Sequence, residues 1–389
     1  MTSTERERSG PLAGVRVVDF TANMSGPFAT MILGDQGADV IKVEPPEGDV
    51  IRAVGTGVAG MSAYFANLNR SKRSLAVDLN RAEAEPVMRA LLDSADVVIH
   101  NLRSAAAVRL GLDAGTARRG RPSLVHATID GFGREGPYGG RPAYDHVIQA
   151  LSGFAARQID PKRGEPSLIR QGIVDKLTGQ AAAQAVTAAL FERASTGNGQ
   201  TVEVCMLDVA VSVLWPDGMM NHTMIEPDTV LPSVSHSFRL TPTSDGHIAF
   251  ALLTTRQFAM LRDAVGLPGG EPLDTAEARM RQGGAVLRDA ARTLAGHTTA
   301  EAVEMLAAHD IPVAPVVSLE ALHDDPQIRA NAILREFDHP VLGAVRQADP
   351  AVRFNGARPE DLTPAPQLGQ HDREAVSYTH LTLPTICSV

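Results

Sequence analysis

Cysteine is almost absent from this sequence. Only Cys205 and Cys387 occur, and neither belongs to a CxxC motif. A disulfide framework and a cysteine-based metal or redox site are therefore excluded, and a reducing cytoplasm is the expected location. The sequence also lacks any run of eighteen apolar residues, and its first ten residues are polar. We therefore expect neither a membrane-spanning helix nor a secretory signal.

An excess of positive charge and the common catalytic motifs are missing as well. The formal net charge is -9, and no long basic run occurs. This balance argues against a surface for nucleic acid or an anionic membrane, so an anionic ligand would need a local basic pocket. No GxSxG elbow, HExxH motif, P-loop or metal-spaced Cys/His cluster is present. Serine hydrolases, zinc proteases and P-loop NTPases therefore have no support, and we expect no metal site.

What is present indicates a folded α/β protein with two domains. The 389 residues exceed the roughly 250 to 300 at which a single core stops growing. Apolar residues make up 44 % and charged residues 21 %, which is typical of globular proteins. Short apolar segments alternate with helical patterns, with strands expected at 15–20, 38–44, 96–100 and 124–129 and helices at 27–36 and 83–95. This alternation predicts a parallel, doubly wound sheet.

Proline and glycine positions suggest where the domains divide. An alanine-rich helix is expected at 175–194, and prolines interrupt the sequence beyond residue 224. We expect a large domain at 11–224, a small domain at 225–334, and a return to the large domain at 335–376. Residues 377–389 have no periodicity, which suggests a non-native or disordered tail.

A glycine-rich segment at 55–60 formally matches the dinucleotide motif GxGxxG. A dinucleotide site requires the motif between the first strand and its helix, whereas here the first strand ends at Phe20. A glycine loop without a nucleotide is therefore the better interpretation.

Asp175 is the candidate catalytic residue. It stands at the expected start of the alanine-rich helix, where an aspartate most often serves only as an N-cap. The helix dipole and free amides are expected to lower its pKa and keep it ionised. An ionised carboxylate in a dry cleft can attack a thioester without a general base.

Several basic residues follow or lie near the ends of the early strands, where ligands of doubly wound sheets bind. They could hold phosphates or form a solvated surface, and the sequence leaves both open. They are Lys42, Arg70, Lys72, Arg73, Arg103 and Arg109. His146 and His236 stand alone, and an isolated histidine is more often structural than catalytic.

The order and spacing of seven segments resemble family III CoA-transferases, also called the CaiB/BaiF family. The segments are 11–20, 37–44, 69–75, 95–101, 144–153, 196–200 and 366–371. The resemblance implies a Rossmann-like large domain and a smaller α/β domain in an interlocked homodimer. It implies a coenzyme A thioester as substrate, with no permanently bound cofactor, and a carboxylic acid as the second substrate.

The resemblance also assigns residues. Asp175 matches the catalytic aspartate, which is expected to pass through a mixed anhydride and an aspartyl-CoA thioester. Asn101 and Arg109 are expected on the CoA-binding surface, with Arg70, Lys72 and Arg73 near the pantetheine or the phosphates. Lys42, Met24 and Tyr144 complete the expected CoA site.

Two departures bear on the reaction. Formyl-CoA transferases carry glutamine where this chain has Met24, which argues against formate and oxalate as substrates. The related α-methylacyl-CoA racemases carry histidine where this chain has Tyr144, whose ordinary pKa near 10 suits proton exchange poorly. His146 is expected to point elsewhere. CoA transfer is therefore favoured over racemisation, and a non-catalytic acyl-CoA-binding protein is the alternative from another class.

Overall fold

The computed structural model describes residues 9–58, 60–159, 164–228, 230–231, 238–270 and 273–377. The chain forms two compact units: Met1–Leu214 with Ala332–Val389, and Trp215–Asn331. The sequence had placed the smaller domain at 225–334. Residues 378–389 of the expected tail lie outside the described residues, as does His236.

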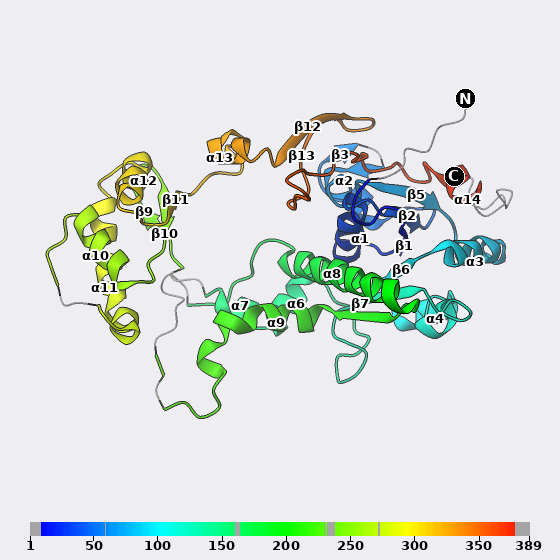
Figure 1. Ribbon diagram of the computed structural model, residues 1–389, viewed down its shortest axis with the longest axis horizontal. Helices are drawn as coiled ribbons and strands as arrows, with labels where there is room; N and C mark the ends of the chain where they lie inside the picture. The colour runs from blue at the N-terminus through cyan, green and yellow to red at the C-terminus, as the bar shows by residue number, and fades with distance from the viewer. Residues whose placement is uncertain are drawn as a thin grey trace. The chain divides into compact units, whose positions relative to one another are not determined.

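A six-stranded parallel sheet forms the centre of the first unit (Figure 1). Its strands are β1 (Arg16–Phe20), β2 (Asp39–Glu44), β5 (Lys72–Ala76), β6 (Val97–His100), β7 (Val125–Asp130) and β8 (Thr201–Cys205). They lie in the order β5-β2-β1-β6-β7-β8, and every neighbouring pair is parallel. The predicted parallel α/β sheet is confirmed. The strand order reverses between β1 and β6, and ligands of such sheets bind at this reversal.

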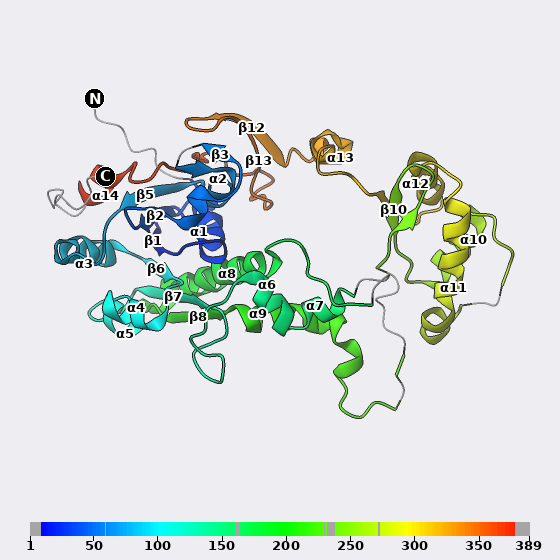
Figure 2. The same ribbon diagram turned by 180° about the vertical axis from the view of Figure 1, so that it is seen from behind.

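Helices cover both faces of this sheet, because the central strands β1 and β6 carry apolar residues on both faces. One face packs on α1 (Ser25–Asp35), α6 (Asp145–Leu151), α8 (Ile173–Thr196) and α9 (Met206–Gly218). The other packs on α3 (Glu85–Ser94), α4 (Ser104–Arg109) and α5 (Ala114–Ala117), seen from behind in Figure 2. Val17 and Ile99 belong to the first core, and Val18 and Val98 to the second. Alternate strand residues thus serve opposite faces, as the pleat requires.

Helices α1 and α8 approach each other closely because Gly179 has no side chain. A Cβ atom at Gly179 would lie 2.6 Å from the carbonyl oxygen of Ser25 and 3.0 Å from the Phe28 ring. Any larger residue would push α8 away from α1. The first turns of these two helices therefore lie together.

The rest of the first unit is built from short elements. They are η1 (Val50–Ala53), β3 (Gly57–Val58), β4 (Met61–Ser62), α2 (Ala63–Asn69), η2 (Ala82–Ala84), α7 (Phe154–Arg157), the β12–β13 hairpin (Leu334–His339 and Gly343–Ala348) and α14 (Asp372–Ser377). The glycine-rich segment at 55–60 contributes β3, which pairs with β4. It does not join β1 to α1, as a dinucleotide site would require.

The second unit has its own antiparallel sheet and core. Strands β11 (Val313–Pro315), β10 (His247–Phe250) and β9 (Thr241–Pro242) lie in that order. They pack with α10 (Thr255–Ala264), α11 (Ala276–Leu294) and α12 (Thr299–Ala308). This unit also contains η3 (Met220–His222), η5 (Leu322–Asp324) and α13 (Pro326–Ala330). Among the described residues, no helix combines the length and apolar composition needed to cross a membrane.

Candidate active site

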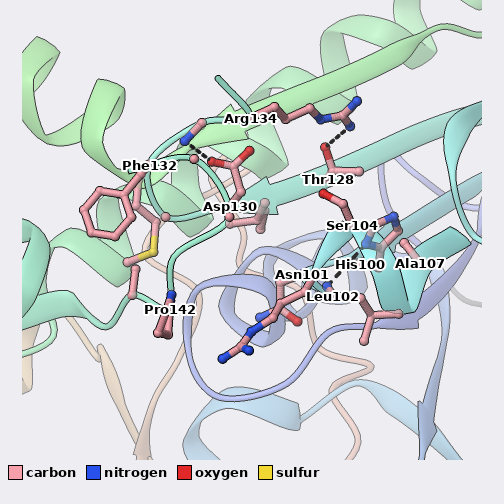
Figure 3. Close-up of a pocket in the computed structure, with 18 of the residues that line it drawn as sticks. His100, Asn101, Leu102, Ser104, Ala107, Thr128, Asp130, Phe132, Arg134 and Pro142 are labelled. Carbon is pink, nitrogen blue, oxygen red and sulfur yellow. Dashed lines mark hydrogen bonds between the residues drawn. The ribbon is translucent and has the colours of Figure 1, made fainter. Parts of the chain in front are cut away.

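A cavity of about 500 Å³ lies at the carboxyl ends of three sheet strands. Asn23 and Ser25 line it after β1, and residues 128–134 line it at and after the end of β7. Residues 100–104, 107 and 108 line it at and after the end of β6. Figure 3 shows His100 at the end of β6, Asn101 directly after it, and Thr128 and Asp130 from β7 around this space. Because β1 and β6 flank the reversal of strand order, the cavity occupies the position where ligands of this architecture bind.

Asp175 lines this cavity from the first turn of α8. The N-cap is Gly172, so Asp175 is the third residue of the helix and the expectation of an N-cap is wrong. The expected lowering of its pKa is also wrong. Burial and the neighbouring Asp145 carboxylate raise the pKa of Asp175 to about 6, against a partial lowering by the hydroxyl and the backbone N–H of Ser25.

Asp145 supports Asp175 from the first residue of α6. One oxygen of the buried Asp145 carboxylate accepts a hydrogen bond from the backbone N–H of Asp175 at 2.9 Å. The other accepts a bond from the side-chain amide of Gln149, which also binds the backbone of Ile169 and Gln171. Helix α6 therefore fixes both the segment leading into α8 and the position of its first turn.

The loop between β1 and α1 is held from three directions. The Asn101 amide donates to the carbonyl oxygen of Ala22 (2.8 Å) and accepts from its N–H (3.0 Å). Lys42 Nζ donates to the carbonyl oxygen of Thr21 at 2.8 Å. Asp49 Oδ1 accepts from the backbone N–H of Asn23 at 3.2 Å. Asn101 lies in the cavity wall, where the resemblance placed it near CoA, but much of its amide is engaged in holding this loop.

Four basic residues assigned to CoA instead form ion pairs within the protein. None of them lines the cavity. Their pairs are Lys42–Asp49 (3.0 Å), Lys72–Asp19 (3.1 Å), Arg70–Asp35 (2.7 Å) and Arg73–Asp39 (2.5 Å). The side chains of Lys42 and Lys72 are 0 % exposed. Both lysines lie inside strands β2 and β5 and not beyond a strand end, so burial keeps them from any ligand in the cavity.

The cavity is lined by other cations. Arg103, at the N-cap of α4, and Arg141 both line it and are exposed. Among the described carboxylates, none forms an ion pair with either arginine; Arg141 lies 4.6 Å from the centre of the Tyr138 ring. Arg109 is exposed at the end of α4 and does not line the cavity.

Tyr144 and Met24 occupy different places near Asp175. Tyr144 lines the cavity and is exposed. Met24 packs beside Gly172, where an added Cβ atom would lie 2.6 Å from its sulfur and 3.8 Å from Asp175 Oδ2. The His146 ring lies parallel to that of Tyr144 with centroids 6.3 Å apart, and its charge would lower the pKa of Asp175. His146 is not among the residues that line the cavity, so the expectation that it points elsewhere stays a prediction.

Sequence reasoning missed several residues of this site. Asp145 lies in the matched segment 144–153, but neither it nor Ser25 was given a role, because their roles come from packing between α1, α6 and α8. His100 and His126 line the cavity with ring centroids 5.3 Å apart. Burial lowers the pKa of both, that of His100 to about 4, so both are neutral at physiological pH. Their positions at the end of β6 and within β7 were the available signal.

Comparison with known proteins agrees with this architecture. The chain is 31 % identical over 392 residues to the succinate–glutarate CoA-transferase of Agrobacterium fabrum, covering 95 % of this chain and 96 % of that protein. It is 30 % identical to the succinyl-CoA:glutarate CoA-transferase of Mus musculus, covering 93 % and 85 %. A crystal structure of an aspartate-to-alanine mutant of Rv3272 from Mycobacterium tuberculosis has a TM-score of 0.83 and 29 % identity, covering 95 % of this chain and 99 % of that chain. The model of CoA-transferase family III matches residues 12–372, and the chain belongs to this family.

Proposed function

We propose that this protein is a CoA-transferase that moves coenzyme A from an acyl-CoA thioester to a carboxylic acid through an aspartyl-CoA thioester on Asp175. One observation carries the proposal. Asp175 presents a carboxylate to the cavity and, among the described residues, forms no ion pair that would neutralise it. Its raised pKa makes it a better nucleophile than an ordinary carboxylate, and with a pKa of about 6 it is still ionised in roughly ten of eleven molecules at pH 7.

The proposed reaction proceeds by four acyl transfers that need no external base. A carboxylate oxygen of Asp175 bonds to the acyl carbon of the donor, the C–S bond breaks, and CoA leaves as the thiolate. The thiolate attacks the aspartyl carbon of this anhydride and releases the donor acid. The acceptor carboxylate attacks the aspartyl thioester and again expels the thiolate. The thiolate then attacks the acceptor's acyl carbon, which forms the new thioester and frees Asp175.

Arg103 and Arg141 are the proposed partners of the CoA phosphates. Both line the cavity and neither has a carboxylate partner among the described residues. Guanidinium groups bind phosphate oxygens with two parallel hydrogen bonds, which suits this role. The ion-paired Lys42, Arg70, Lys72 and Arg73 do not compete for it.

The relatives' names suggest the class of substrate. The Agrobacterium fabrum and Mus musculus relatives are named as CoA-transferases that act on succinate and glutarate, which are dicarboxylic acids. We propose an acyl-CoA donor and a carboxylic acid acceptor, with Met24 in place of glutamine favouring substrates other than formate and oxalate. Dicarboxylic acids are the first to test.

We also propose the interlocked homodimer of the family. An apolar groove of about 1160 Å³ lies along α1, α8 and residues 346–354. Phe191 on α8 is 82 % exposed there. A second copy of the chain would cover such a surface, which a monomer rarely exposes.

Trapping the intermediate tests the reaction. The protein is incubated with succinyl-CoA, and hydroxylamine is then added to convert an activated aspartate to its hydroxamate. Mass spectrometry of the peptides should find the modification at Asp175 and nowhere else. An unmodified protein, across a panel of acyl-CoA donors, would contradict the proposal and favour a non-catalytic acyl-CoA-binding protein.

Proton exchange at the α-carbon of an acyl-CoA is the second candidate function. The charge of His146 would lower the pKa of Asp175, and a racemase uses such a pair of residues. Deuterium from solvent would then enter 2-methylacyl-CoA without an aspartyl adduct. His146→Gln would abolish that exchange, whereas it should leave CoA transfer largely intact.

A further inference from the structure

Asn23 presents an uncommitted amide to the cavity. It lines the same space as Asp175 and Ser25, and it is half-buried. The backbone N–H of Asn23 is bound to Asp49, but no described residue hydrogen-bonds to its side chain. An amide that carries two N–H donors and a carbonyl acceptor therefore remains free to contact a bound substrate.

The backbone of Asn23 is held in an unusual conformation. Its φ angle is 67°, in the left-handed region that residues with side chains rarely adopt. Asparagine tolerates this region better than most residues, and glycine tolerates it without strain. The chain could therefore turn here with glycine, and asparagine adds only its amide.

Buried charges fix this conformation. Asp49 accepts from the Asn23 N–H through one oxygen and from Lys42 through the other. Lys42 in turn donates to the carbonyl oxygen of Thr21, and the Asn101 amide binds both the carbonyl oxygen and the N–H of Ala22. Strained backbone that the surrounding structure holds so firmly is concentrated at functional sites. The backbone that carries the Asn23 side chain is thus fixed before any ligand binds.

The position of Asn23 relative to the nucleophile follows from the loop. Ser25, two residues later, contacts the Asp175 carboxylate through its hydroxyl and its backbone N–H. A substrate carbonyl attacked by Asp175 must lie in the cavity next to Ser25. Asn23 precedes Ser25 by two residues in the same loop and lines the same cavity.

We propose that Asn23 is a catalytic residue that donates a hydrogen bond from its side-chain amide to the oxyanion formed when Asp175 attacks a thioester. This inference rests on the proposed function and deepens it. As the bond between the aspartate oxygen and the acyl carbon forms, the carbonyl π electrons move onto the acyl oxygen, which accepts the bond from Asn23. When the carbonyl reforms, the C–S bond breaks and the thiolate leaves with its electron pair. A fixed donor stabilises this oxyanion more than the ground-state carbonyl, because it needs no reorientation.

Asn23→Gly is the decisive variant. Glycine keeps the left-handed turn and the backbone bond to Asp49, and removes only the amide. We expect kcat for succinyl-CoA:glutarate transfer to fall by about 100-fold, with KM for succinyl-CoA within about threefold, as for other oxyanion donors. Asn23→Asp has the same shape but carries a negative charge and no donor, and it should lose more activity than glycine.

Asn355→Gly is the matched control, because Asn355 is also left-handed (φ 51°) and does not line the cavity. It should keep wild-type kcat, and both glycine variants should keep the wild-type melting temperature within a few degrees. If Asn23→Gly forms the Asp175 hydroxamate and turns over as fast as the wild type, the role of Asn23 is wrong while the proposed function stands. A loss of activity that only follows a lower melting temperature would also overturn it. If the wild type itself forms no adduct, the proposed function and this inference fall together.

Discussion

Two groups of charged residues in the first unit differ in one respect. In the group formed by Asp19 on β1, Lys42 on β2, Lys72 on β5 and the nearby Asp49, every charge has a partner of opposite sign. Asp19 is 0 % exposed and binds Lys72, and Lys42 binds Asp49. Although burial alone would raise it, the pKa of Asp19 is lowered to about 2 by Lys72, Lys42 and two threonine hydroxyls.

In the cavity beyond β1, β6 and β7, Arg134 pairs with Glu203, but Asp175, Arg103 and Arg141 form no ion pair among the described residues. Burial and Asp145 raise the pKa of Asp175 to about 6, and Arg103 and Arg141 form no ion pair with a described carboxylate. The same residue types thus serve opposite purposes. Paired charges hold the loop that forms the cavity, and unpaired charges remain available to a substrate. Perturbed, unpaired titratable groups in a cleft are those that mark functional sites.

Removing the unpaired carboxylate should have the largest effect on activity. Asp175→Asn should lower transfer by at least about 1000-fold, because the amide cannot form the aspartyl intermediate. It should also stabilise the fold at neutral pH. The folded pKa of Asp175 is above its ordinary value, so the stability that this group contributes is present at low pH and lost as the pH rises through about 6.

At pH 7.5 the free energy of unfolding of Asp175→Asn should therefore exceed that of the wild type by roughly 1–2 kcal/mol, after allowing for the partial exposure of Asp175. Its melting temperature should be higher as well. The difference should shrink at pH 5. A variant less stable than the wild type at pH 7.5 would show that Asp175 has a structural partner.

Breaking the paired group should have the largest effect on stability. Lys42→Met leaves Asp49 and Asp19 buried with one cation fewer and should cost about 3–5 kcal/mol of unfolding free energy. Arg89→Met is the control, because Arg89 and its partner Glu85 are both exposed, and it should change the free energy of unfolding little. Urea unfolding measures the stability of both variants. Equal midpoints for the two variants would contradict the importance of the buried network.

Removing the unpaired cations should weaken CoA binding without unfolding the protein. Arg103→Met and Arg141→Met should each raise KM for acyl-CoA by about tenfold, which corresponds to one lost phosphate contact. Loss of charge should also make KM less sensitive to salt. Arg119→Met, an exposed arginine outside the cavity, should behave as the wild type. If Arg109→Met raises KM for acyl-CoA more than Arg103→Met or Arg141→Met does, the phosphates bind near Arg109, as the family resemblance implies, and not at the two cavity arginines.

The smallest effect should come from tuning Asp175 through its neighbour. Asp145→Asn keeps an oxygen that can accept the N–H of Asp175 but removes the negative charge that raises its pKa. Transfer requires the ionised Asp175, so activity should fall as the pH decreases through about 6 in the wild type. In the variant, this limb of the kcat/KM profile should move to lower pH by about half a unit to one unit. An unmoved limb would assign the titration to another group.

Much of the large unit could be predicted from local patterns. The apolar segments at 15–20, 38–44, 96–100 and 124–129 became β1, β2, β6 and β7, because strands buried on both faces need continuous apolar residues. Strand β5 was not predicted, because it begins with Lys72 and Arg73, and charged residues do not indicate a buried strand unless their partners are known.

The sequence by itself determined the alternation of strands and helices, because that depends on residues near one another in the chain. It also determined the family resemblance and the choice of Asp175 as the candidate nucleophile, because these depend on the order and spacing of short segments along the chain. The tertiary structure alone decided which charges are paired. Lys72 meets Asp19 across 53 positions, and Asp175 meets Asp145 across 30. The pKa of a carboxylate depends on burial and on the charges around it in space, so helix position suggested a lowered pKa for Asp175 while the fold raised it.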